Sequence, residues 1–328
     1  MAVYSQLSTE ELSALVARWD VGPLLSAKGI AEGISNSNWL IETGGGPGGN
    51  DDQRSRRHIL TIYERRIHTA DLPFFLGLLD HLSNAGCPVP RTLRTREGAG
   101  FTMVGDKAAA LIEFMPGLSP SRPSAQQAHA VGRALAGVHL ASADYAGSRG
   151  NDLGPAQSAA ILSAYSAAQL ETIDSALPPM AEAARSIARQ WPVGLPSSII
   201  HSDLFPDNVL MTGDTVSGLI DFYFACTDSM AYDLAVTHAA WSFAGPTQGY
   251  RAEVGSALVK GYESVRQLTA EERDALPVLA QGACLRFIAS RTADWFDTPP
   301  DALVTRKDPL EFVRLYDFYN RCGADSFT

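Results

Sequence analysis

The sequence has few cysteines, no long apolar run and no C-x-x-C pair. Its four cysteines stand far apart, at positions 87, 226, 284 and 322. This spacing argues against a disulfide framework or a zinc site and favours a reducing compartment. No apolar stretch approaches the length of a membrane span, and the segment from Met1 to Asp20 lacks a basic region followed by an apolar run. We therefore expect a cytoplasmic protein that does not insert into a membrane.

An excess of positive charge is also absent. The net charge is −10, from 26 basic and 36 acidic residues, which disfavours nucleic acid or an anionic membrane as the main partner. The 328 residues are 45% hydrophobic and 19% charged, as in an ordinary globular protein of one large or two ordinary domains. The sequence leaves the oligomeric state undetermined.

The most informative segment is His-Ser-Asp-Leu-Phe-Pro-Asp-Asn, from His201 to Asn208, followed thirteen residues later by Asp221-Phe222. The pattern H-x-D-L-x-x-x-N and then D-F is typical of the catalytic loop and the metal-binding aspartate of kinases. Phosphoryl transfer from ATP needs a carboxylate to accept a proton and oxygen ligands for Mg²⁺. We therefore expect Asp203 to be the base, and Asn208 and Asp221 to bind Mg²⁺. The alternative is that these are ordinary turn residues between strands.

Three further residues in or after this motif have predicted roles of their own. His201 is expected to hold the loop by hydrogen bonds, because phosphoryl transfer needs no nucleophilic histidine. Asp233 is expected to fix the segment after Asp221 without touching a ligand. Asp207 could bind a substrate ammonium group or could be a simple turn residue.

The order of predicted elements indicates an α+β fold with two lobes. The first third predicts a small sheet with one long inserted helix, and the remainder is mostly helical, including a helix from Ala156 to Ala176. Met115-Pro116-Gly117 interrupts the pattern and is expected to be a hinge. We therefore predict a nucleotide-binding lobe over residues 1–115 and a catalytic and substrate-binding lobe over residues 116–328.

The predicted turn from Gly33 to Ser37 occupies the place of a kinase glycine-rich loop, although it has one glycine instead of three. Short polar side chains and backbone N–H groups there could contact phosphate, and the candidates are Ser35, Asn36, Ser37 and Asn38. A plain hairpin turn is the alternative. The backbones of Glu113 and Met115 could bind adenine, although Met115 could equally be a core residue.

The lysine expected on the third strand of a kinase is missing. Thr61 stands in its place, in Ile59-Leu60-Thr61-Ile62-Tyr63. Lys107, just before the strand that leads to the hinge, is a candidate to contact the nucleotide phosphates instead. A solvated loop lysine is the alternative.

Several segments together resemble homoserine kinases of the aminoglycoside-phosphotransferase-like type, whose fold is protein-kinase-like. The resemblance covers nearly the whole chain, and it is carried by Lys28 to Asn38, Ile59 to Glu64, Asp71 to Leu76, His201 to Val209, Gly218 to Cys226, Tyr232 to Ala235, Leu285 to Phe287 and Lys307 to Pro309. It implies Mg²⁺-dependent transfer of the ATP γ-phosphate to the hydroxyl of L-homoserine, a step of threonine biosynthesis.

Homoserine carries a carboxylate that some cation must neutralise. Arg286 and Arg291 lie on a largely apolar predicted helix, where an arginine needs a partner. They could bind this carboxylate or form ion pairs with aspartates of the helical lobe.

Three other functions compete with this interpretation. The first is phosphorylation of an aminoglycoside, choline or a thio-sugar on the same fold. The second is a protein kinase, but the short interval between Tyr223 and Ala231 leaves no room for an activation loop that ends in A-P-E. The third is a non-catalytic pseudokinase, which the missing lysine favours and the complete set of Asp203, Asn208 and Asp221 disfavours.

Overall fold

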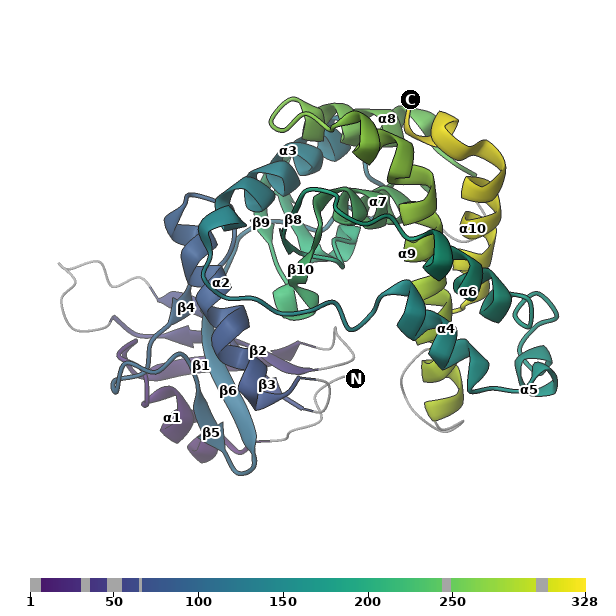
Figure 1. Ribbon diagram of the computed structural model, residues 1–328. Helices are drawn as coiled ribbons and strands as arrows, with labels where there is room; N and C mark the ends of the chain where they lie inside the picture. Colours follow the sequence, from purple (N-terminus) through teal and green to yellow (C-terminus); the bar gives the residue numbers. More distant parts are fainter. Residues whose placement is uncertain (1–6, 31–35, 46–54, 65–66, 244–248, 299–305) are drawn as a thin grey trace. The chain divides into compact units, whose positions relative to one another are not determined.

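The computed structural model describes residues 7–30, 36–45, 55–64, 67–243, 249–298 and 306–328. The chain divides into two compact units, which we call the N-terminal unit, Met1–Pro116, and the C-terminal unit, Gly117–Thr328. The N-terminal unit carries most of the strands and the C-terminal unit is mostly helical (Figure 1). None of the helices in the described ranges is both long enough and apolar enough to cross a lipid bilayer.

The N-terminal unit is built on one antiparallel sheet. Its strands are β1 (Leu24–Ile30), β2 (Asn36–Thr43), β3 (Arg56–Tyr63), β4 (Thr92–Leu93), β5 (Thr102–Val104) and β6 (Lys107–Glu113). The described strands follow the order β1-β2-β3-β6-β4, and β5 also pairs with β6. The unit's α-helices are α1 (Thr9–Val16) and α2 (Leu72–Asn84).

Helix α1 closes one face of this sheet. Ser8 and Glu11 form a capping box at its start, which satisfies two backbone N–H groups that would otherwise lack partners. Leu12, Leu15 and Val16 then turn to the sheet and pack with residues of β2, β3 and β6 in one apolar cluster. Burial of this stripe, rather than helix propensity, holds so short a helix in place.

The C-terminal unit surrounds two small hairpin-like sheets with helices. Strand β7 (Ser197–Ile200) pairs with β10 (Cys226–Ser229), and β8 (Val209–Thr212) pairs with β9 (Thr215–Leu219). The α-helices are α3 (Ala125–Ala141), α4 (Pro155–Ser163), α5 (Ala167–Glu171), α6 (Met180–Gln190), α7 (Met230–Trp241), α8 (Ala252–Glu263), α9 (Ala270–Asp297) and α10 (Leu310–Cys322).

Helices α3 and α8 approach one another closely because glycine lies at their contact. A Cβ atom on Gly132 would lie 2.1 Å from the Leu258 carbonyl oxygen, and one on Gly261 would lie 2.1 Å from the His129 carbonyl oxygen. Helix α9 packs against α7, α10, α4 and α6 and so lies at the centre of the helix packing of this unit.

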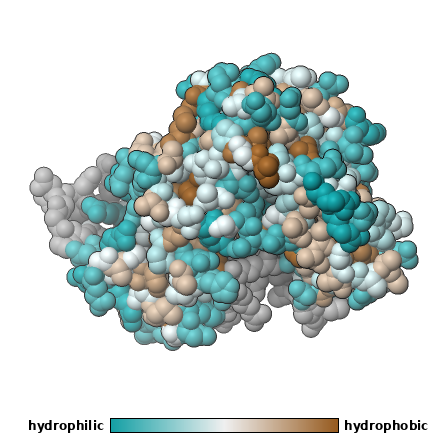
Figure 2. Space-filling view, in the orientation of Figure 1, coloured by the Kyte–Doolittle hydropathy of each residue, from teal (hydrophilic) through white to brown (hydrophobic). Residues whose placement is uncertain are grey.

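On the face that Figure 2 shows, the described residues are mostly hydrophilic and apolar residues are scattered in small groups.

The structure corrects three of the predicted elements. The predicted helix from Ala156 to Ala176 is two helices, because Ser166 and Gln169 form a capping box that starts α5. Strand β10 was not predicted, since its four residues, Cys-Thr-Asp-Ser, lack an apolar alternation, and pairing with β7 creates it. Strand β2 begins at Asn36, so part of the predicted phosphate-binding turn is strand.

Candidate active site

The catalytic loop connects β7 to β8 and carries Asp203 and Asn208. The Asn208 side-chain amide donates to the Asp203 carbonyl oxygen at 2.8 Å and lies 3.5 Å from the Asp203 carboxylate. Between them, the Leu204 side chain is buried and its carbonyl oxygen accepts a hydrogen bond of 2.9 Å from the indole of Trp241 on α7. The loop is therefore fastened at its centre, while the Asp203 side chain remains 19% exposed and accessible.

Asp233, from the first turn of α7, anchors the start of this loop. Its carboxylate accepts the backbone N–H groups of His201 and Ser202, each at 2.7 Å, and the Nε2–H of His139 at 3.0 Å. Burial alone would raise the pKa of Asp233, but hydrogen bonds from His139 and His201 hold it below the ordinary value. Asp233 thus fixes the segment before Asp203, whereas the sequence predicted that it would fix the segment after Asp221.

Ser202 is a part of the site that the sequence analysis missed. It is buried and its φ is +59°, in the left-handed region that non-glycine residues seldom occupy. Its hydroxyl donates to the Phe224 carbonyl oxygen at 3.0 Å, and its own N–H is held by Asp233. Such strain persists only where surrounding contacts impose it, and nothing in the sequence marks a serine for this conformation.

His201 is buried and both of its ring nitrogens are engaged. Nε2 lies 2.9 Å from the Ile220 carbonyl oxygen and must donate, so Nδ1 accepts the Asp203 N–H at 3.2 Å. Burial lowers the pKa of His201, which keeps the ring neutral. With no free nitrogen, His201 links the loop to the segment before Asp221 and is not placed to accept a substrate proton.

Arg286, from α9, closes the other side of the loop. Its Nη1 donates to the Ser202 carbonyl oxygen, and its Nη2 lies 3.5 Å from the Asp203 carboxylate. The guanidinium also lies 4.8 Å from the centre of the Phe287 ring. Burial raises the pKa of Asp203 above its ordinary value, and Arg286 counters only part of that effect. This shift moves the pKa of the Asp203 carboxylate toward neutral pH, and a general base is most effective when its pKa lies near the working pH.

Asp221 caps the short 3₁₀-helix η4 (Phe222–Phe224) with a left-handed backbone, at φ +65°. Surrounding protein atoms, and after them the negative charges of Asp203 and Asp207, raise the pKa of Asp221 to about 7. Lys307 opposes this shift at both Asp221 and Asp203, so it lies within electrostatic reach of the loop. No role for Lys307 was predicted from the sequence, where it stands between Arg306 and Asp308 and no motif marks it.

The donor set fits a Mg²⁺ ion that is shared with a substrate. Within the described ranges no three His, Cys, Asp or Glu side chains converge as a closed metal site. Mg²⁺ seldom needs one, because it commonly binds one or two carboxylates, several waters and substrate phosphates. Burial is the main cause of the raised pKa of Asp221, and the repulsion from Asp203 and Asp207 that adds to it is what a divalent cation would relieve. Asp207 adds negative charge, and its carbonyl oxygen accepts the Ser119 hydroxyl at 3.2 Å.

The predicted phosphate contacts of the N-terminal unit lie on a strand rather than in a turn. The three described candidates pair with β3, Asn36 with Tyr63, Ser37 with Ile62 and Asn38 with Thr61. This pairing makes them part of a strand, and the local sequence does not reveal it. Asn36 and Ser37 are buried. Ser35 lies outside the described residues.

Lys107 is the first residue of β6 and not a loop lysine. It forms an ion pair with Glu64, whose side chain is 4% exposed, and Glu64 also accepts the Ser37 hydroxyl. Thr61, at the expected lysine position, is buried and donates to the Asn38 side chain at 2.9 Å. The ion pair therefore joins the first residue of β6 to the residue that directly follows β3.

Two other predicted residues are partly committed to protein contacts. The Glu113 N–H donates to the Arg91 carbonyl oxygen at 2.9 Å, so this N–H is not free for adenine, and the Met115 N–H is the remaining candidate donor. Arg291 binds the Glu311 carboxylate at 2.6 Å and the Asp308 carbonyl oxygen at 2.8 Å. The ion-pair alternative thus describes Arg291 in this structure, with a glutamate in place of an aspartate.

Comparison with known proteins places these features in context. The model of a family described as "Phosphotransferase enzyme family" matches residues 26–277. A homoserine kinase of Granulibacter bethesdensis is 42% identical over 319 residues, which cover 97% of each chain. A homoserine kinase of Methylorubrum populi is 44% identical over 327 residues, which cover 99% of this chain and 98% of that one.

Solved structures show the same fold at much lower identity. An amicoumacin kinase in complex with AMP-PNP, Ca²⁺ and Ami superposes with a TM-score of 0.70 at 13% identity, covering 97% of this chain and 94% of that one. A spectinomycin phosphotransferase in complex with ADP and spectinomycin gives a TM-score of 0.69 at 13% identity, covering 96% and 95%. The predicted α+β, protein-kinase-like fold is thereby confirmed.

Proposed function

Because the chain belongs to the phosphotransferase enzyme family, and within it to the homoserine kinases, we propose that it transfers the γ-phosphoryl group of ATP to the hydroxyl of L-homoserine. The product is O-phospho-L-homoserine, an intermediate of threonine biosynthesis. The observation that carries the proposal is the loop itself, since Asp203 is accessible, fixed on both sides and close to Asn208. A cytoplasmic location remains a prediction from the cysteine spacing.

In this proposal Asp203 accepts the proton of the homoserine hydroxyl as the oxygen attacks the γ-phosphorus, and the bond from that phosphorus to the bridging oxygen breaks, so that ADP leaves. Arg286 and the Asn208 amide hold the base in place from two sides. Asn208 and Asp221 would hold Mg²⁺, which would supply positive charge against the negative charge that develops on the phosphate oxygens. His201 and Asp233 position the loop and take no part in proton transfer.

The N-terminal unit is proposed to bind the nucleotide. Lys107, held by Glu64, is the candidate for the phosphate contact that the third-strand lysine makes in protein kinases. Further phosphate contacts are proposed for Ser35, Asn36, Ser37 and Asn38, of which the last three lie on β2. Adenine contacts are proposed for Glu113 and Met115. Residues 116–328 are proposed to carry the chemistry and the acceptor site, where Asp207, Arg286 and Arg291 stay as predictions.

A panel of acceptors tests the proposal and its alternative together. Purified protein with ATP and Mg²⁺ should phosphorylate L-homoserine with a kcat/KM at least about a hundredfold above that for an aminoglycoside, choline or a thio-sugar, because polar recognition groups reject acceptors that leave them unpaired. ADP release and mass spectrometry of the product measure this directly. Preference for another acceptor would establish the alternative function, and no turnover with any acceptor would support a non-catalytic role.

A further inference from the structure

A cavity of about 290 Å³ lies within the C-terminal unit and adjoins the catalytic loop. The loop contributes Phe205 and Pro206, which stand between Asp203 and Asp207 in the sequence. Ala239 and Ala240 from the end of α7 line it as well, and their small side chains leave room that larger residues would fill. Its volume suits a small metabolite more than a drug-sized ligand.

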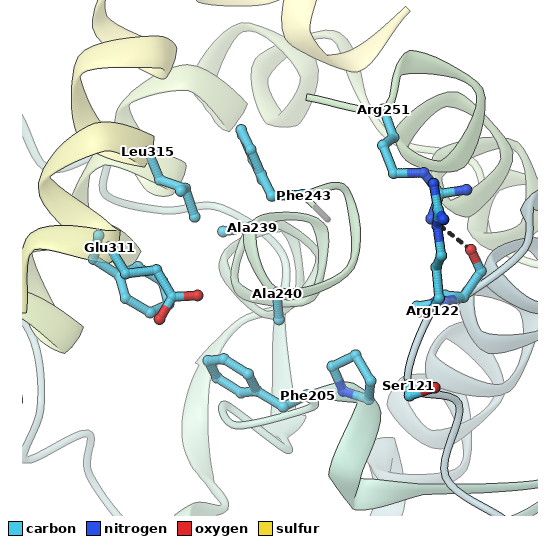
Figure 3. Close-up of a pocket in the computed structure, with 12 residues that line it drawn as sticks. Ser121, Arg122, Phe205, Ala239, Ala240, Phe243, Arg251, Glu311 and Leu315 are labelled. Carbon is cyan, nitrogen blue, oxygen red and sulfur yellow. Dashed lines mark hydrogen bonds between the residues drawn. The ribbon is translucent and has the colours of Figure 1, made fainter. Parts of the chain in front are cut away.

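The charged groups of this cavity are arranged by sign. In Figure 3, Arg122 and Arg251 lie on one side and Glu311 lies on the opposite side, with the alanines of α7 and Phe205 between them. A ligand in the cavity therefore meets positive charge at one end and negative charge at the other. This pattern is complementary to a zwitterion, and an α-amino acid is the common small molecule of that kind.

The two arginines differ in how they are held. Arg251 is fixed, because its Nη1 donates to the Pro123 carbonyl oxygen at 2.7 Å and its Nη2 pairs with Glu253 at 3.2 Å. Arg122 is exposed and has no hydrogen bond or ion pair within the described part of the chain. A free guanidinium beside a fixed one can close on a carboxylate with two parallel N–H donors, a geometry for which arginine is suited.

The opposite wall is also organised. Arg291 holds Oε2 of Glu311 at 2.6 Å, and among the described residues no donor reaches Oε1. The guanidinium of Arg291 lies 4.6 Å from the centre of the Phe312 ring, which limits its movement. Arg291 therefore positions a glutamate oxygen that remains able to accept from an ammonium group.

We propose that this cavity binds the amino-acid head of the acceptor. The α-carboxylate is held by Arg122 with Arg251, the α-ammonium is held by Glu311, and the side chain extends past Phe205 toward the loop that carries Asp203. The inference rests on the proposed function. It also moves carboxylate binding away from Arg286 and Arg291, because neither of these arginines lines the cavity.

The assignment can be tested with substrate analogues that each lack one charged group. Each analogue is combined with a variant that lacks the residue proposed to bind that group. The acceptors are L-homoserine, 3-aminopropan-1-ol, which lacks the carboxylate, and 4-hydroxybutanoate, which lacks the ammonium group. Arg122→Met should lower kcat/KM about tenfold or more for L-homoserine and for 4-hydroxybutanoate, and leave 3-aminopropan-1-ol unchanged. Glu311→Gln should lower it for L-homoserine and 3-aminopropan-1-ol and leave 4-hydroxybutanoate unchanged.

Both variants should fold, since Arg122 has no partner to lose and glutamine at 311 can still accept from Arg291. Arg189→Met, which removes an exposed arginine paired with Glu182 on α6, is the matched control and should leave all three values unchanged. Equal losses for all three acceptors, or wild-type values for L-homoserine in both variants, would overturn the inference while the proposed function stands. Failure of the wild-type protein to phosphorylate L-homoserine would overturn the proposed function itself.

Discussion

The two units hold their predicted functional residues in different ways. In the C-terminal unit the catalytic loop is fastened from several elements, by Asp233 and Trp241 of α7 and by Arg286 of α9. In the N-terminal unit the predicted phosphate contact, Lys107, is held by an ion pair with Glu64, which directly follows β3.

This difference matches the different requirements of proton transfer and of phosphate binding. A proton acceptor must be held in one geometry, and strain at Ser202 shows that the surrounding contacts determine the backbone there. A phosphate contact needs a positive charge at the right distance, and an ion pair on a strand suffices for that. We therefore expect changes near the loop to affect stability or rate strongly, and changes at the Lys107–Glu64 pair to affect the use of ATP with a smaller effect on stability.

The largest effect is expected at Asp233. Asp233→Ala leaves three buried donors without an acceptor, the N–H groups of His201 and Ser202 and the Nε2–H of His139. Breaking a buried charged network of this kind costs about 3–5 kcal/mol, and urea denaturation should show a loss of that size together with lost activity. Asp152→Ala, at an exposed pair with Arg149, should change stability by less than about 0.5 kcal/mol. Similar values for the two variants would show that the anchor is unimportant.

Asp203→Asn should separate rate from stability. The change removes the proposed base while keeping its size, so turnover should fall at least about a hundredfold. Because burial raises the pKa of Asp203, the carboxylate is less favourable in the folded protein than in water, and its removal should leave stability equal or slightly higher. Steady-state kinetics and urea denaturation measure the two quantities. Asp214→Asn, in the turn after β8, is the control, and half of the wild-type rate in Asp203→Asn would exclude the base assignment.

Lys107→Met should act on ATP alone. The loss of one charge-assisted phosphate contact, worth about 1.5–3 kcal/mol, should raise the KM for ATP about tenfold or more and leave the KM for L-homoserine unchanged. Glu64→Gln, which keeps a hydrogen-bonding partner for Ser37, should give a smaller increase. Lys28→Met, an exposed lysine on β1, is the control. Unchanged ATP kinetics in Lys107→Met would mean that other groups hold the phosphates.

The smallest effect per step is expected in the dependence of stability on pH. Burial lowers the pKa of His238 to about 3 from an ordinary value of 6.5. The unfolded chain therefore takes up a proton at this site between these values and the folded protein does not. Stability should fall below pH 6.5 as pH decreases, by at most about 1.4 kcal/mol per pH unit for this residue.

Urea denaturation of His238→Gln at a series of pH values checks this. The variant should lose stability less steeply between pH 6 and pH 4, and part of the slope should remain because burial also lowers the pKa of His201. His68→Gln, at an exposed position, should reproduce the wild-type slope. A wild-type slope in His238→Gln would show that its titration is not linked to folding.

The extent of successful prediction also differs between the units. The candidate residues of the loop could be named from the sequence because they are close together in it and their types suit phosphoryl-transfer chemistry. Ser202, Lys307 and the cavity around Arg122 were not found, since each depends on elements far apart in the chain. In the N-terminal unit the predicted turn was partly wrong, because pairing of β2 with β3 extends the strand to Asn36.

The sequence by itself determined the α+β order of elements and the residues of the H-x-D-L-x-x-x-N and D-F motif. Each of these is a local property, fixed by neighbours within a few positions. Only the tertiary structure decided that Lys107 pairs with Glu64, that Asp233 holds His201 and Ser202, and that Arg122 and Arg251 lie across a cavity from Glu311. These contacts join distant segments, and the burial that shifts the pKa of Asp203 exists only once the chain has packed.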